Sequence, residues 1–207
     1  SSYSHVVQLL IDASICFLTF ILASASTYFL NDVLDAKKDR LHPDKKNRPL
    51  AKESISPVIA LFACSVFMLC SITVAIVFST GLLLYIVAYF FLMTLYSFLL
   101  RNIFVIDVLC ISSGFVIRVM SGAIAVDVPI SLWLYVCMGF GALFISLAKR
   151  LSEAISAPDS IETRRKTMHY YGIKLLGLDM NVVLLISLIA YCLYILTANN
   201  FAVNNSM

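Results

Sequence analysis

Charged side chains are scarce in this chain of 207 residues, because Asp, Glu, Lys and Arg together make up only 13% of it. A soluble domain carries about 25%. Hydrophobic residues make up 61%, and a soluble fold of this length cannot hide so much apolar surface from water. The composition excludes an ordinary soluble domain and predicts that lipid is the solvent of most of the chain.

Patterns that identify other classes of protein are absent from the sequence. The six cysteines all fall inside apolar runs, and none shows the spacing of a zinc site or a disulfide framework. There is no internal repeat, coiled-coil heptad or low-complexity tract, and the apolar runs lack the alternation of membrane β-strands. The sequence therefore predicts one all-α membrane domain over residues 1–207, with no linker.

Six apolar runs are long enough to cross a bilayer, which takes about 20 residues of helix. They cover residues 9–30, 54–79, 82–100, 103–126, 130–148 and 174–198. Lys and Arg lie in or beside the connections 31–53, 101–102 and 149–173, with the exception of Arg118. Basic loops stay on the cytoplasmic side of a membrane, so these three connections are predicted to face the cytoplasm. The net charge of +3 follows from this topology and indicates no nucleic-acid partner.

The first basic connection also contains aspartates at a regular spacing. Asp32, Asp35 and Asp39 stand at i, i+3 and i+7, which places them within about 60° of one another on a helix. Such carboxylates suit Mg²⁺, which completes its shell with water and phosphate oxygens, and Asn31 can add an amide oxygen. A solvated segment with ion pairs to neighbouring bases explains the spacing equally well.

A cationic segment follows directly, with the sequence HPDKKNRP over residues 42–49. Pro43 and Pro49 prevent the helix from continuing, while Lys45 and Arg48 supply positive charge for anionic oxygens. Carboxylates for a metal beside cations for phosphate predict a diphosphate site. Binding to anionic lipid headgroups is the alternative, and it accounts for the lysines but not for the aspartate spacing.

Two charged residues lie inside the fourth apolar run, Asp107 and Arg118. An ionisable group inside a membrane costs a few kcal/mol unless it is paired or faces a wet cavity. Eleven residues, or about three helical turns, separate the two, so they share a helix face but cannot touch. Each is expected to pair with another helix or to face a polar cavity.

The run NDVLDAKKD at residues 31–39 resembles the NDxxDxxxD motif of the UbiA superfamily of intramembrane prenyltransferases. Its continuation DRLHPDKKNRPLA resembles the DRxHPxKxxRPxA pattern of one branch, the decaprenyl-phosphate phosphoribosyltransferases. Later segments extend the resemblance over nearly the whole chain: Tyr96-Ser97 with Arg101, Asp107-Val108 with Arg118 and Gly122, Ser131-Leu132-Trp133, and Lys149-Arg150 with Glu153.

The resemblance implies a helix bundle of the UbiA type in the cytoplasmic (inner) membrane, with its active site facing the cytoplasm. It implies Mg²⁺-dependent transfer of a 5-phosphoribosyl group from phosphoribosyl diphosphate to a polyprenyl (decaprenyl) phosphate, with release of diphosphate, for cell-envelope polysaccharide synthesis. The implied catalytic metal ligands are Asp32, Asp35 and Asp39. The implied substrate-binding residues are Asn31, Lys45, Arg48, Tyr96, Arg101, Arg118, Lys149, Arg150 and Glu153.

Ordinary structural roles are the alternatives for the later residues. Arg101 lies where a basic side chain snorkels to the membrane surface, and Lys149 and Glu153 stand at i and i+4, a spacing that also supports a helix. The charged residues Asp107 and Arg118 suit a structural pair as well as a substrate contact.

The chain departs from the superfamily in its length and in its later loop. The superfamily usually has about nine spans, so the predicted six imply that the first helix and the last one or two are missing. The second aspartate cluster of typical prenyltransferases is absent, which favours the phosphoribosyl branch over transfer of a prenyl chain to an aromatic ring. A non-catalytic transporter or an inactive fragment is the alternative from another class, although no pair of Gly/Pro-interrupted helices favours transport. The sequence leaves the oligomeric state open.

Overall fold

A computed structural model describes residues 2–41, 45–103, 106–129, 131–156 and 173–204 of the chain. Within these ranges the fold contains helices and no strand. The helices are α1 (Ser2–Asp39), α2 (Pro57–Phe78), α3 (Thr80–Phe98), α4 (Ile106–Ala125), α5 (Leu132–Ser156) and α6 (Ile173–Asn204), with short 3-10 turns η1 (Lys45–Asn47) and η2 (Leu100–Asn102). All six α-helices contain a stretch long and apolar enough to cross a membrane. The predicted all-α fold with six spans is confirmed, and the chain is an integral membrane protein.

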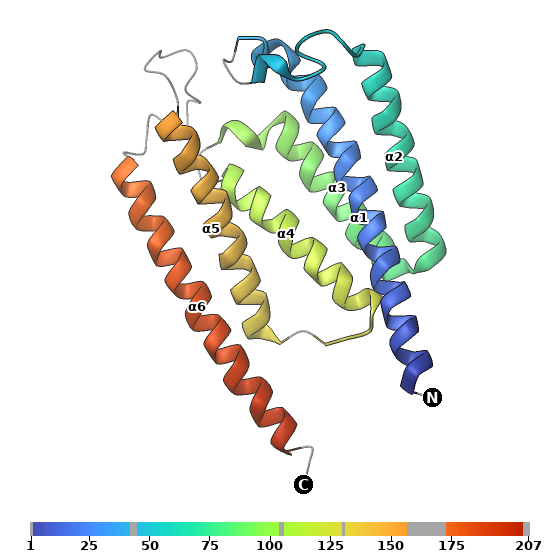
Figure 1. Ribbon diagram of the computed structural model, residues 1–207, viewed down its shortest axis with the longest axis vertical. Helices are drawn as coiled ribbons and strands as arrows, with labels where there is room; N and C mark the ends of the chain where they lie inside the picture. The colour runs from blue at the N-terminus through green and yellow to red at the C-terminus, as the bar shows by residue number, and fades with distance from the viewer. Residues whose placement is uncertain (1, 42–44, 104–105, 130, 157–172, 205–207) are drawn as a thin grey trace. The chain divides into compact units, whose positions relative to one another are not determined.

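The helices belong to two compact units. Unit 1 consists of Ser1–Leu99 and Ile117–Val128, and unit 2 consists of Leu100–Val116 and Pro129–Met207. In unit 1, α1, α2 and α3 pack against one another, and in unit 2, α5 packs along α6 (Figure 1). Helix α4 contributes its first half to unit 2 and its last turns to unit 1.

Small and hydroxyl-bearing residues hold α1 against α2. Ser26 Oγ donates a hydrogen bond to the carbonyl oxygen of Cys64 at 2.9 Å, and Ser71 Oγ donates to that of Thr19 at 3.1 Å. Lipid tails are as apolar as the side chains that they solvate, so membrane helices gain their packing energy from close approach and interhelical hydrogen bonds. These contacts fix the register of α1 and thereby the place of the aspartates near its end.

Ala23→Leu is expected to lower the thermal unfolding midpoint of the purified protein in detergent. Ala23 is 0% exposed and packs with Phe20 and Tyr89, and added methylenes in a filled site cost about 1–3 kcal/mol. Ser14→Leu is the matched control, because Ser14 lies exposed on the same helix and its enlargement should leave the midpoint unchanged. Equal midpoints for the two variants would contradict the close packing of α1.

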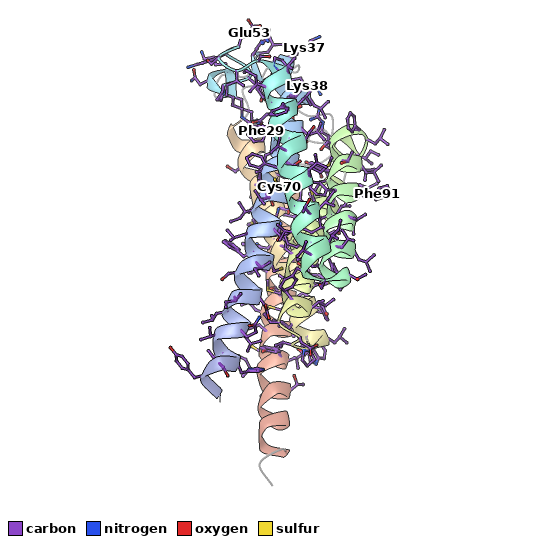
Figure 2. All side chains as sticks on the ribbon, turned by 90° about the vertical axis from the view of Figure 1, so that its right-hand side faces the viewer. Phe29, Lys37, Lys38, Glu53, Cys70 and Phe91 are labelled. Atoms are coloured by element: carbon purple, nitrogen blue, oxygen red, sulfur yellow. The ribbon has the colours of Figure 1, made fainter. Side chains whose placement is uncertain are left out.

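Helix α1 continues through Asn31 to Asp39, so the first connection begins nine residues later than the sequence predicted. Its 38 residues reach about 57 Å at 1.5 Å per residue, which exceeds the roughly 30 Å of a hydrocarbon core. Residues 31–39 contain no Gly or Pro, so nothing in that stretch stops the helix. Figure 2 shows the charged residues Lys37, Lys38 and Glu53 at one end of unit 1. They lie nearer to that end than Phe29 and Cys70 do.

Candidate functional site

The aspartates of the first motif lie on the last turns of α1, where Arg48 bridges two of them. Arg48 Nη1 donates to Asp32 Oδ1 and to Asp39 Oδ2, each at 3.0 Å. One guanidinium nitrogen therefore contacts two carboxylates that are seven residues apart, as expected for side chains on one helix face. Asp39 is 7% exposed, so little water reaches its carboxylate. The positive charge of Arg48 offsets the repulsion between the carboxylates of Asp32 and Asp39.

Residues 45–48 form a tight turn that holds Arg48 over this face. The Arg48 amide donates to the carbonyl oxygen of Lys45 at 3.0 Å, which forms η1. Two residues further on, Leu50 is 7% exposed and packs with Ala36 of α1 and Ala60 of α2. Because this apolar anchor lies so close to Arg48 in the sequence, the arginine cannot move far from the aspartates. Residues 42–44 of the cationic segment lie outside the described residues.

The oxygen atoms on this face suit a hard divalent cation. Asn31 Oδ1 is buried and receives no hydrogen bond from any residue that the structure describes. Asp35 lies between Asp32 and Asp39 on the same stripe of α1, and carboxylate and amide oxygens are ligands that Mg²⁺ accepts. The described part of the chain contains no preassembled group of three or more acidic, His or Cys side chains around one point. The oxygen donors of Asn31 and the three aspartates are nevertheless of the type that Mg²⁺ accepts, and a cation there would share carboxylate oxygens with Arg48.

A cavity of about 500 Å³ lies in unit 1 along the α1 face that leads to the aspartates. It is lined by Ala13, Cys16, Phe17, Phe20, Ile21, Ser24, Ala25 and Tyr28 of α1 and by Arg118 and Gly122 of α4. Phe17, Ile21, Ser24 and Tyr28 recur at three- and four-residue steps, and the same steps continue to Asp32, so these side chains share one stripe of the helix. An apolar cavity wall and the carboxylate face thus adjoin along α1.

Arg118 brings a positive charge to the wall of this cavity. Its Nη2 donates to the Tyr89 hydroxyl of α3 at 2.7 Å, and its Cζ lies 5.1 Å from the centroid of the same ring. The Tyr89 hydroxyl in turn donates to Ser24 Oγ of α1 in a long contact of 3.5 Å. The expectation that Arg118 contacts another helix is confirmed. Tyr89 and Ser24 were not predicted as site residues.

In unit 2, Arg150 of α5 forms an ion pair with Asp107 in the first turn of α4. The distance from Nε to Oδ2 is 2.8 Å, and the two side chains are only 8% and 4% exposed. The expectation that Asp107 pairs with another helix is confirmed. The sequence pattern grouped Arg150 with the substrate-binding residues and did not predict this protein partner.

The other predicted site residues lie near helix ends. Tyr96 is half-buried in the last turn of α3, and Arg101 lies in η2. Lys149 is exposed on α5, and Glu153 belongs to the same helix, although its side chain lies outside the described part of the structure.

Helix α5 continues to Ser156, eight residues past the predicted end of the fifth span. The prediction that Lys149 opens a loop is therefore wrong. Residues 149–157 contain no Gly or Pro before Pro158, so the charged segment remains helical although it is no longer apolar.

The sequence is similar to known proteins of one family. Residues 4–204 match the UbiA prenyltransferase family. The chain is 32% identical over 158 residues to the decaprenyl-phosphate phosphoribosyltransferase of Mycolicibacterium smegmatis, covering 76% of this chain and 50% of that protein. It is 32% identical over 165 residues to the protein of the same name from Mycobacterium tuberculosis H37Rv, covering 80% and 55%. The chain thus spans about half the length of these curated relatives.

The fold is also similar to a solved structure, that of a UbiA homolog from Archaeoglobus fulgidus bound to DMAPP and Mg²⁺. The TM-score is 0.80, with 19% identity, over 90% of this chain and 67% of that one. At this identity the likeness concerns the fold alone, while the family match extends over most of the sequence. The resemblance drawn from the motifs is confirmed, and the chain belongs to the UbiA prenyltransferase family.

Proposed function

We propose that the chain transfers a 5-phosphoribosyl group from phosphoribosyl diphosphate to a polyprenyl phosphate at the cytoplasmic face of the inner membrane. The observation that carries this proposal is the stripe of α1 on which an apolar cavity wall leads into carboxylates bridged by Arg48. Such a stripe offers a polar end for a diphosphate and an apolar end for a lipid chain. The names of the two mycobacterial relatives support this choice of donor and acceptor.

The donor diphosphate binds at the polar end of the stripe. Asp32, Asp35 and Asp39 would hold Mg²⁺, with Asn31 as a further oxygen donor, and the metal would supply positive charge for the diphosphate leaving group. Arg48 already lies at these carboxylates, so its guanidinium is in place to pair with diphosphate oxygens. Lys45, Tyr96, Arg101, Lys149 and Glu153 are further proposed substrate contacts on the strength of the family motifs.

The reaction breaks the bond between ribose C1 and the diphosphate oxygen, and the bonding electrons leave with the diphosphate. A phosphate oxygen of the acceptor then bonds to C1. This oxygen is already ionised and needs no general base, so electrostatic stabilisation of the leaving diphosphate supplies most of the rate.

The acceptor occupies the apolar end of the stripe. Its polyprenyl chain lies along Phe17 and Ile21, and its phosphate meets the guanidinium of Arg118. Eight residues, or about 12 Å of helix, separate Ser24, at the level of the Arg118–Tyr89 contact, from Asp32. That length leaves room for a ribose and the acceptor phosphate between the cavity and the metal ligands.

Transfer of a prenyl chain to an aromatic acceptor is the second candidate. The apolar cavity favours it, and so does the solved homolog with bound DMAPP. Diphosphate release from purified chain with Mg²⁺ separates the two functions. Phosphoribosyl diphosphate with polyprenyl phosphate should release diphosphate, and DMAPP with an aromatic acid should not. The reverse pattern would establish the second candidate, and no release in either mixture would contradict both.

Arg48→Gln is expected to raise the KM for phosphoribosyl diphosphate by about 10- to 100-fold, because hydrogen bonds to charged groups contribute about 1.5–3 kcal/mol. The same variant should bind Mn²⁺ more tightly than wild type when no diphosphate is present, since Asp32 and Asp39 lose their cationic partner. Lys46→Gln is the matched control, because it removes an exposed positive charge two residues away. Equal effects of both variants on Mn²⁺ binding would refute the bridging role of Arg48.

A further inference from the structure

We propose that Asp107 and Arg150 are a positioning pair, in which Arg150 does not bind substrate but fixes α5 so that Lys149 does. The inference rests on the proposed function, in which Lys149 contacts a substrate phosphate. It assigns different roles to two neighbouring basic residues of one motif, because Arg150 positions α5 and Lys149 binds substrate. It also gives a role to Asp107.

The burial of the two basic residues differs sharply. Arg150 is 6% exposed and Asp107 is 3% exposed, whereas Lys149 is exposed. Consecutive side chains on a helix point about 100° apart. Because Arg150 faces α4, Lys149 points in a different direction, away from α4. Because the ion pair fixes the rotation of α5 about its axis, it also fixes the direction of Lys149.

The position of Asp107 suits an anchor. It lies in the first turn of α4, where the partial positive charge of the helix N-terminus stabilises a carboxylate. Its Oδ2 lies 2.8 Å from Arg150 Nε, and both side chains are buried, so little water screens the attraction between the two charges. This ion pair ties the first turn of α4 to α5.

A second contact between α4 and α5 defines their alignment. A Cβ atom added at Gly139 would lie 3.8 Å from Val116 Cγ2, so the two helices are also close about three turns from the ion pair. The order of the contacts, Asp107 with Arg150 and Val116 with Gly139, runs antiparallel. Two contacts at different heights fix a helix in both rotation and translation, and the loss of the ion pair would weaken this alignment.

Binding measurements on single variants distinguish a positioning pair from a direct ligand. If Arg150 acts only through the pair, Asp107→Asn and Arg150→Gln remove the same anchor and should raise the Kd for phosphoribosyl diphosphate by the same factor, about tenfold. If Arg150 binds substrate, Asp107→Asn leaves the ligand in place and should raise the Kd far less than Arg150→Gln. Unequal factors would overturn the proposal. Lys149→Met is the reference variant, with an expected rise in the Kd for phosphoribosyl diphosphate of at least tenfold.

The double variant Asp107→Leu with Arg150→Met provides the second measurement. Breaking a buried pair leaves an uncompensated charge, whereas apolar side chains of similar volume are tolerated. Each single variant should therefore lower the thermal midpoint by about 5 °C or more, and the double variant should regain both the midpoint and a Kd within about threefold of wild type. A double variant that regains the midpoint but not the Kd would show that Arg150 itself touches substrate. If wild-type protein binds no phosphoribosyl diphosphate, the proposed function fails first, which is a separate outcome.

Discussion

Asp35→Asn should reduce turnover by about 100- to 1,000-fold, because it removes the charge of one proposed metal ligand and retains its shape. Asp35 is the most informative of the three aspartates. Asp32 and Asp39 both hold Arg48, so their replacement would also release that arginine. Asp35 lies on the same stripe of α1 and is not one of the two carboxylates that Arg48 bridges. The substitution therefore tests the metal role without removing either of those two carboxylates.

Asp12→Asn is the matched control for this variant. Asp12 lies on α1 as well, near the other end, where its carboxylate accepts a hydrogen bond from Gln8 at 2.9 Å. The same loss of charge there should leave turnover unchanged, and both variants should keep the wild-type thermal midpoint. Wild-type turnover in Asp35→Asn, together with unchanged Mn²⁺ binding, would remove the metal role from the carboxylate face.

Arg118→Met is expected to lower kcat/KM for the polyprenyl phosphate by about 30- to 100-fold. A hydrogen bond to a charged group contributes about 1.5–3 kcal/mol, and the apolar surroundings of Arg118 strengthen its attraction for an anion. The KM for phosphoribosyl diphosphate should change little, because the donor diphosphate binds at the aspartates. Stability should not fall greatly, since an uncharged side chain is cheaper than a guanidinium at this depth.

Tyr89→Phe tests the same contact from its other side. The variant keeps the ring below the guanidinium but removes the hydroxyl that accepts the 2.7 Å hydrogen bond. We expect about a tenfold loss of kcat/KM for the acceptor, because Arg118 loses its orientation and not its charge. Tyr85→Phe, one turn earlier on α3, is the control and should behave as wild type. An unchanged acceptor KM in Arg118→Met would contradict the placement of the acceptor phosphate.

The spans were predictable because hydropathy is a local signal that accumulates over some 20 residues. The ends of the helices were harder to predict from hydropathy. Both α1 and α5 continue into charged segments, to Asp39 and Ser156, because a helix ends where the backbone is interrupted and not where the side chains become polar. The next prolines along the sequence, Pro43 and Pro158, indicate these ends better than hydropathy does.

The candidate site was predictable only where its geometry is local. The spacing of Asp32, Asp35 and Asp39 determines a shared face on any helix. The bridge from Arg48 depends on a turn anchored by Leu50 in an apolar cluster that includes α2, and no spacing within one helix encodes that contact. Tyr89 is one of ten tyrosines, and only its tertiary contact with Arg118 distinguishes it.

The central claim is that the carboxylate face and the cavity of α1 together move a phosphoribosyl group onto a lipid phosphate. The most direct test uses phosphoribosyl diphosphate with carbon-labelled ribose and phosphorus-labelled diphosphate, added with Mg²⁺ and polyprenyl phosphate to membranes that contain the chain. We predict that the carbon label enters the lipid extract while an equal molar amount of phosphorus label appears as free diphosphate in water, and that Asp35→Asn prevents both. Carbon label that stays in the aqueous phase, with folded wild-type chain present in the membranes, would contradict the claim.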